Sequence, residues 1–153
     1  MSKTRVRIQK MLSTHRVVNL AYTDKSGSPQ SCALWYASDN LRLYYLSSLS
    51  TQHGKSLQDG GKIAFTINRD DQNWQEIQGI QGQGFVRPIG RNSIAWQVYI
   101  QKFPFVTDQF SDLNEALQNT QIWEINPTWI RYIDNSISFG HKEELDLDID
   151  PHD

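Results

Sequence analysis

Hydroxyl, amide and basic side chains gather in one short segment, residues 47–55, which reads Ser-Ser-Leu-Ser-Thr-Gln-His-Gly-Lys. The segment follows an alternating hydrophobic run and precedes a short helical pattern, so it predicts a strand that leads into the first turn of a helix. Backbone N–H groups at such a turn lack intrahelical acceptors, and the helix dipole is positive there, which suits a phosphate. The candidate ligands are Ser47, Ser48, Thr51, Gln52, His53 and Lys55. Ordinary capping of the helix by Ser50 or Thr51 is the structural alternative.

A second segment, residues 78–84, combines glycine with glutamine as Gln-Gly-Ile-Gln-Gly-Gln-Gly inside a strand pattern. Glycine within a strand is typical of a bulge, a barrel bend or the close approach of another group. The segment lacks the strand–turn–helix setting of a dinucleotide site. We interpret it as a strand beside a planar ring, with Gln78 and Gln81 hydrogen-bonding the ring edge, because an amide both donates and accepts. A bulged strand with exposed glutamines is the alternative.

No other residues indicate a centre of chemistry. The four histidines, at positions 15, 53, 141 and 152, lack the spacing of metal ligands, so no metal site is expected. No nucleophile elbow or Ser/His/Asp arrangement is evident, and no catalytic residue is assigned. The single cysteine, Cys32, cannot form an internal disulfide and is predicted to be an inert buried thiol.

The elements that must position these residues are mostly strands. A helix is predicted over 3–14, a short helix over 50–57, a helix over 91–102 and another short one over 111–117. Strands are predicted over 17–23, 31–37, 41–47, 63–68, 74–86, 121–125 and 129–133, with an interruption at Asn126–Pro127. This order favours a mainly β fold with flanking helices, a Greek-key-like antiparallel barrel, over a doubly wound sheet.

The charge is unevenly distributed along the 153 residues. Residues 143–153 hold six acidic and no Lys or Arg side chains, which leaves 15 basic and 11 acidic residues in the rest of the chain. We predict one domain over 1–142 and a solvated acidic tail over 143–153, although the alternation of residues 145–150 could also pair as an edge strand. A net positive body could attract an anionic ligand.

Several classes of partner are not indicated. No clustered Lys/Arg stripe suggests nucleic acid, and no run approaches the roughly 20 apolar residues of a membrane span. The basic first ten residues are followed by no apolar region, so no signal peptide is expected and a cytoplasmic location is the default.

In their order along the chain, these segments resemble the pyridoxamine 5'-phosphate oxidase-like family of FMN-binding split β-barrels, and within it a subgroup of small bacterial proteins. The likeness runs from about Ile8 to Lys142. Its most telling parts are residues 43–48 with 51–53, residues 77–84, and residues 123–125 with 130–135 and 139–140. The resemblance implies a homodimer with two FMN sites at the subunit interface.

The resemblance also implies that the strand-to-helix turn holds the flavin phosphate. Ser47, Thr51 and Lys55 match the hydroxyls and the base of the family's turn, whereas Gln52 and His53 replace its Arg-Lys pair. The upstream Arg and Lys of the oxidase, near Ser31 and Tyr36, are also replaced.

We therefore expect an FMN-dependent oxidoreductase acting on an unidentified small molecule, without true pyridoxamine 5'-phosphate oxidase activity. The alternative is a non-catalytic module that binds or senses a flavin, a deazaflavin or haem. Exposed aromatic residues such as Trp123 and Trp129 are expected near the dimer interface.

Overall fold

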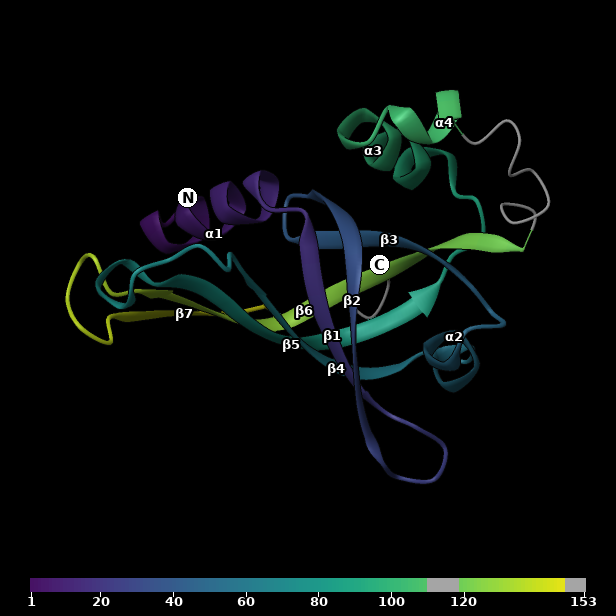
Figure 1. The fold of residues 1–153 in the computed structure, drawn as a ribbon, viewed down its shortest axis with the longest axis horizontal. Coiled ribbons are helices and arrows are strands. Elements are labelled where there is room, and N and C mark those ends of the chain that lie inside the picture. The colour runs from purple at the N-terminus through teal and green to yellow at the C-terminus, as the bar shows by residue number, and fades with distance from the viewer. Residues whose placement is uncertain (110–118, 148–153) are drawn as a thin grey trace.

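The computed structural model describes residues 1–109 and 119–147 (Figure 1). The strands in this part of the chain are β1 (Val17–Thr23), β2 (Pro29–Asp39), β3 (Arg42–Ser48), β4 (Gly61–Asn68), β5 (Gln78–Pro88), β6 (Thr120–Asp134) and β7 (Lys142–Asp146). The helices are α1 (Lys3–Thr14), α2 (Gln52–Leu57), α3 (Ser93–Lys102) and α4 (Phe105–Gln109), with a 3₁₀ turn, η1 (Trp74–Glu76). The helix predicted over 111–117 lies outside the described residues.

Six of these strands close into a barrel. The sheet order is β3-β2-β1-β4-β5-β6-β7, every pairing is antiparallel, and β3 also pairs with β6. The long strand β6 forms the closing seam: its first part pairs with β3, its last part pairs with β7, and β5 runs beside both. The predicted fold class, an antiparallel barrel with flanking helices, is confirmed.

The seam strand continues through Asn126 and Pro127, where the sequence predicted an interruption. The register of β5 against β6 shifts between Gln83 and Gly84, next to Pro127. Proline has no N–H to give to a ladder and is tolerated at such a bulge. A Cβ atom at Gly84 would collide with the Asn126 carbonyl, so glycine allows the two strands to approach.

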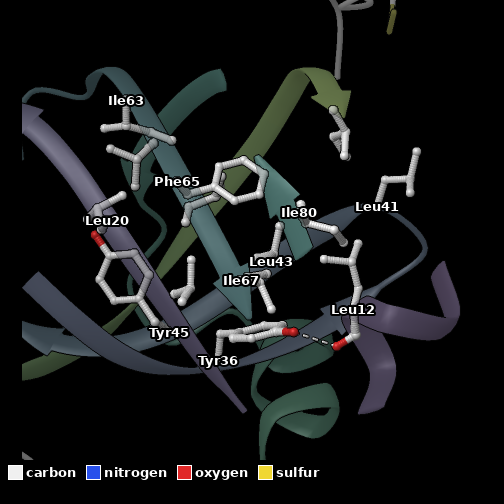
Figure 2. Close-up of a cluster of buried hydrophobic side chains, with 14 of the residues drawn as sticks. Leu12, Leu20, Tyr36, Leu41, Leu43, Tyr45, Ile63, Phe65, Ile67 and Ile80 are labelled. Atoms are coloured by element: carbon white, nitrogen blue, oxygen red, sulfur yellow. Dashed lines mark hydrogen bonds between the residues drawn. The ribbon is translucent and has the colours of Figure 1, made fainter. Parts of the chain in front are cut away.

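The barrel interior is filled by the alternate side chains of its strands (Figure 2). Ile63, Phe65 and Ile67 of β4 point inward, as the alternation predicted. Helix α1 packs against the barrel through Ile8, Met11 and Leu12. The buried Tyr36 hydroxyl of β2 donates a 2.7 Å hydrogen bond to the Leu12 carbonyl, which ties the end of α1 to the barrel (Figure 2).

Helix α3 covers the outer side of β2 and β3. It buries Ala95 and Tyr99, whereas Ile94 on the same helix is 69% exposed. The helix carries apolar residues on more than one side, so periodicity alone did not identify the packed face. No helix in the described part of the chain is long and apolar enough to cross a membrane.

The alternating segment after Lys142 forms the edge strand β7, the second of the two outcomes that the sequence left open. Glu143 lies on its inner side, with a side chain only 14% exposed. Its carboxylate accepts hydrogen bonds from Thr4 Oγ1 (2.8 Å) and Arg7 Nη1 on α1, and from His141 Nε2 (2.8 Å). Strand β7 therefore fixes helix α1 against the sheet through Glu143.

Candidate functional site

The β3–α2 turn (residues 47–55) has the strand-to-helix geometry that the sequence predicted. Thr51 is the N-cap of α2: its hydroxyl accepts from the Gly54 N–H (3.0 Å) and donates to the Ser48 carbonyl (2.9 Å). The backbone N–H of Lys55 bonds to the Thr51 carbonyl at 2.9 Å. The capping role that the sequence offered as the alternative is thus confirmed for Thr51, whose hydroxyl is already engaged.

Ser47 and His53 form a close pair inside this turn. Ser47 Oγ lies 2.6 Å from His53 Nε2 and 3.4 Å from Thr51 Oγ1, and Ser47 is only 7% exposed. Burial lowers the pKa of His53, so the imidazole is neutral at physiological pH. A neutral ring can accept the Ser47 proton at Nε2. His53 therefore orients Ser47 and adds no positive charge to the turn.

Other donors of the turn remain open to a ligand. The backbone N–H groups of Gln52 and His53 hydrogen-bond to none of the described residues, because they lie in the first turn of α2. The hydroxyls of Ser48 and Ser50 lie 2.9 Å apart on the surface. The ammonium of Lys55 supplies the positive charge on this side of the helix.

Two grooves flank the turn. The hairpin groove, of about 370 Å³, separates α2 from the β1–β2 turn and is lined by Asp24, Lys25, Ser26, Gln52, Lys55 and Ser56. The second groove, of about 450 Å³, lies on the other side of the turn and includes Ser48, Leu49, Ser50 and Arg91. A Cβ atom at Gly54 would collide with the Ser48 carbonyl, so this glycine lets α2 pack directly on the end of β3.

Gln78 and Gln81 lie far from the turn within one chain. Helix α2 precedes β4, whose first residue, Gly61, pairs with Val86 at the far end of β5. Eight residues of extended chain separate Val86 from Gln78, which is roughly 26 Å at the usual rise of a strand. Figure 1 shows α2 at one end of the barrel and the β4–β5 connection at the other. One chain does not bring the two predicted halves of the site together.

The glutamines line a groove of their own. The glutamine groove, of about 310 Å³, is lined by Thr66, Asn68, Arg69, Gln72, Gln78 and Gln81 among others. Gln78 Nε2 donates to Asp134 Oδ2 at 3.1 Å, and Gln81 Oε1 accepts from Arg131 Nη1 at 3.3 Å. Each amide keeps a further donor or acceptor for a ligand.

The glycines of β5 have uses different from the predicted one. Gly82 faces inward, and a Cβ atom there would collide with the ring of Phe65. Gly84 belongs to the bulge beside Asn126. The planar ring beside Gly82 is therefore part of the protein's own core, and of these three only Gly79 borders the glutamine groove.

The expectations for Trp123 and Cys32 are corrected, whereas the expected exposure of Trp129 is found in part. Trp123 is completely buried, and its ring stacks on Tyr45 with centroids 5.9 Å apart, so it cannot lie on an exposed interface. Trp129 is partly exposed, with the Arg131 guanidinium 4.8 Å from its ring centroid. Cys32 is only partly buried, although burial still raises the pKa of its thiol and keeps it in the unreactive form.

The sequence also missed polar and aromatic features near these sites. Among the described residues, the Tyr45 hydroxyl is the one buried side-chain polar atom without a hydrogen-bond partner. Its ring lies 6.4 Å from that of His53. At the opposite end, Trp74 and Phe139 are exposed and in contact with one another. Phe139 follows a predicted strand in turn-like sequence, a signal that could have marked it as a surface residue. Trp74 was predicted to begin a strand, but it lies in the 3₁₀ turn η1, and β5 begins only at Gln78.

A closed antiparallel barrel with flanking helices and a polar turn between β3 and α2 defines a split-barrel protein. The chain superposes with a TM-score of 0.69 on a protein related to general stress protein 26, of the pyridoxinephosphate oxidase family, from Clostridium acetobutylicum (12% identity, 95% of both chains). It superposes with a TM-score of 0.72 on a heme binding protein from Mycobacterium smegmatis (12% identity, 94% of this chain and 57% of that one). Identity this low shows a shared fold alone.

Sequence comparison gives a narrower group. The chain is 32% identical over 110 residues to a UPF0306 protein from Enterobacter sp. strain 638, covering 71% of each chain. It is 29% identical over 109 residues to a UPF0306 protein from Klebsiella pneumoniae strain 342, covering 70% of this chain and 68% of that one. The chain belongs to the UPF0306 family. No protein-family model matches it.

Proposed function

We propose that this protein binds FMN between two copies of its barrel and acts as a flavin-dependent oxidoreductase on a small molecule. The observation that carries the proposal is the placement of the polar residues. Donors suited to a phosphate lie beside grooves at one end of the barrel, and amides suited to a ring edge line a groove at the other. A two-fold pair of barrels running in opposite directions would place one copy's turn beside the other copy's glutamines and build two equal sites.

The donor set fits the two ends of FMN. Lys55, the Ser48 hydroxyl and the free N–H groups of Gln52 and His53 suit an anion, because a charge-assisted hydrogen bond is about twice as strong as a neutral one. Gln78 and Gln81 supply donors and acceptors for the ring edge. The fold is shared with a protein of the pyridoxinephosphate oxidase family, which supports a flavin over other anionic ligands.

The flavin ring, when bound, supplies the hydride and electron chemistry. The chain's own contribution is binding and orientation. Lys55 neutralises the phosphate, and the Ser47–His53 pair keeps the turn in one conformation. No acid or base is assigned, because no described side chain beside the grooves stands out in that role.

The replaced Arg-Lys pair argues against true pyridoxamine 5'-phosphate oxidase activity, since Gln52 and a neutral His53 give a weaker grip on phosphate. A deazaflavin would use the same contacts. Haem is the second candidate, because a heme binding protein shares the fold. A haem would need an axial ligand, and the Nε2 atom of His53 already pairs with Ser47.

The test is a fluorescence titration of the ligand-free protein with FMN and with riboflavin, which has the same ring without the phosphate. Two charge-assisted hydrogen bonds predict an FMN affinity about 100-fold or more above that for riboflavin. Lys55→Ala should weaken FMN binding at least about tenfold and leave riboflavin binding unchanged. The control Lys10→Ala, on the exposed side of α1, should change neither. Equal affinities for the two flavins would remove the phosphate site from the β3–α2 turn.

The absorption spectrum of the purified protein separates the cofactors before any titration. Flavin maxima support the proposal, whereas a Soret band would favour haem. Light scattering adds the assembly state: a stable monomer of 17.7 kDa at working concentrations would contradict a site built from two chains.

A further inference from the structure

Two exposed aromatic residues meet at the glutamine end of the barrel. Trp74 of η1 is 61% exposed and Phe139 of the β6–β7 turn is 81% exposed, yet their rings lie edge to face with centroids 6.0 Å apart. Ile77 (38% exposed) and Ile137 (47% exposed) lie on the same two turns. Figure 1 shows these two turns side by side at one end of the molecule. Exposed apolar side chains gathered in one place are a candidate binding surface.

The aromatic pair is held in place by one asparagine. Asn135 Nδ2 donates to the Trp74 carbonyl at 2.9 Å, and the Asn135 N–H donates to the Ile77 carbonyl at 2.9 Å. The Gly140 N–H in turn bonds to Asn135 Oδ1 at 3.0 Å. The backbones of the two turns are therefore joined, which keeps the turns that carry Trp74 and Phe139 next to each other. Such preorganisation lowers the entropic cost of binding a rigid ligand.

The pair is connected to the glutamine groove through Ile77, three residues after Trp74. Ile77 lines that groove and is bound through its carbonyl to the same Asn135 that holds Trp74. At about 310 Å³ the groove lies at the lower end of the range for small-molecule sites, which is about 300–1,000 Å³. Amides along a groove, with an exposed aromatic pair on the turns next to it, suit a planar heteroaromatic ligand, since its edge needs hydrogen bonds and its face needs apolar contact.

We infer that Trp74, supported by Phe139, is the aromatic wall against which the ligand's ring packs while Gln78 and Gln81 bind its edge. The inference rests on the proposed function, because the phosphate of the same ligand is held by the β3–α2 turn of the second copy. The inference assigns different parts of the ligand to the two residues: Trp74 contacts the ring, and Lys55 binds the phosphate.

The experiment compares riboflavin and FMN titrations of the full-length protein carrying Trp74→Ala or Trp74→Phe. Loss of the wall should weaken both flavins by the same factor, about tenfold, because only ring contacts change. Trp74→Phe should recover most of the affinity. Ile94→Ala, which also removes an exposed apolar side chain but on α3, is the matched control and should have no effect.

The outcomes are distinct. Equal weakening of both flavins with an unchanged assembly state supports the inference, and Lys55→Ala should by contrast affect FMN alone. Unchanged affinities in Trp74→Ala overturn the inference and leave the proposed function standing. Conversion of Trp74→Ala to a monomer also overturns it, because the pair would then be a contact between subunits. Binding of neither flavin to the unmodified protein overturns the inference and the proposed function together.

Discussion

The separation of the two half-sites allows a mixing experiment. In a two-fold dimer each site would take its phosphate end from one chain and its ring end from the other. One variant, Lys55→Glu, removes the charge at the phosphate end and adds a repulsive one. A second variant, Gln78→Ala with Gln81→Ala, removes the amides at the ring end. Lys55 lies on α2, which leads into the start of β4 beside Val86, whereas Gln78 and Gln81 lie near the opposite end of β5, so neither change disturbs the other end of the same barrel.

The magnitudes follow from the contacts. Reversal of the charge at Lys55 should weaken FMN binding about 100-fold, from the loss of one charge-assisted hydrogen bond and the repulsion between like charges. Removal of two neutral hydrogen bonds at Gln78 and Gln81 should weaken it about tenfold. Each variant alone should therefore lack tight sites at an FMN concentration close to the unmodified protein's Kd.

Mixing restores sites only if they span two chains. In a mixed dimer, one site carries both changes and the other carries neither. Random reassortment makes half of the dimers mixed, so a quarter of all sites should regain full affinity. The assay is an FMN titration after the two variants have been mixed under conditions that exchange subunits, with each variant mixed with itself as the control. No gain of tight sites in the mixture would refute a site shared between chains.

Two further predictions concern the helices. Glu143→Gln should lower the free energy of unfolding by about 2 kcal/mol, because it disrupts hydrogen bonds to a mostly buried carboxylate. Glu144→Gln, at a half-exposed pair with Arg131, should have a much smaller effect in the same urea titration. Hydrogen bonding, first from His141, lowers the pKa of Glu143 below 4.5, so its contribution should be complete above that pH and disappear as acid protonates the folded state; equal midpoints for the two variants would contradict this account. Burial lowers the pKa of Lys102 to about 8, below its value in the unfolded chain, so stability should rise with pH between about 8 and 10.4. Lys102→Met should abolish that rise of the free energy of unfolding with pH, measured by urea unfolding at several pH values. An unchanged pH dependence would show that other groups cause the rise.

The barrel could be predicted because most of its strands are buried on one face only. Ile63, Phe65 and Ile67 alternate with exposed residues along β4, and this period identifies both the strand and its inner side. Helix α1 was predicted with its bounds because its apolar residues recur at helical spacing and Ser2 caps its start. In each case a local pattern contains the information that decides the structure.

The first part of β6 shows why Trp123 was misplaced. Its residues 122–125 are all buried, because the barrel interior covers one face of the strand and α3 covers part of the other. A strand covered on both sides loses its alternation, so the sequence offers no sign of which residues point inward. The stacking of Trp123 on Tyr45 depends on closure of β3 against β6, a pairing between segments some 80 residues apart.

The candidate site also combines a feature that local sequence predicts with one that only the folded structure shows. The β3–α2 turn is local, and its N-cap at Thr51 could be predicted from residue types alone. The contact between Ser47 and His53, six residues apart, could not, because it requires the ring to fold back under the turn. That contact changes the chemistry, because His53, a candidate phosphate ligand from the sequence, is held as a neutral partner of a buried serine.

If the site is divided between two chains, cofactor binding and dimerisation are thermodynamically coupled. FMN would bind the dimer and not the isolated barrel, so each bound flavin would stabilise the dimer by its own binding free energy. The phosphate end would then depend on few charges. The turn keeps Lys55, but Gln52 and His53 replace the Arg-Lys pair of the family pattern. A weaker grip on phosphate places more of the affinity on the ring end, where Trp74, Phe139 and the glutamines lie. The ring end should therefore contribute a larger share of the affinity in this protein than in an oxidase that retains both cations.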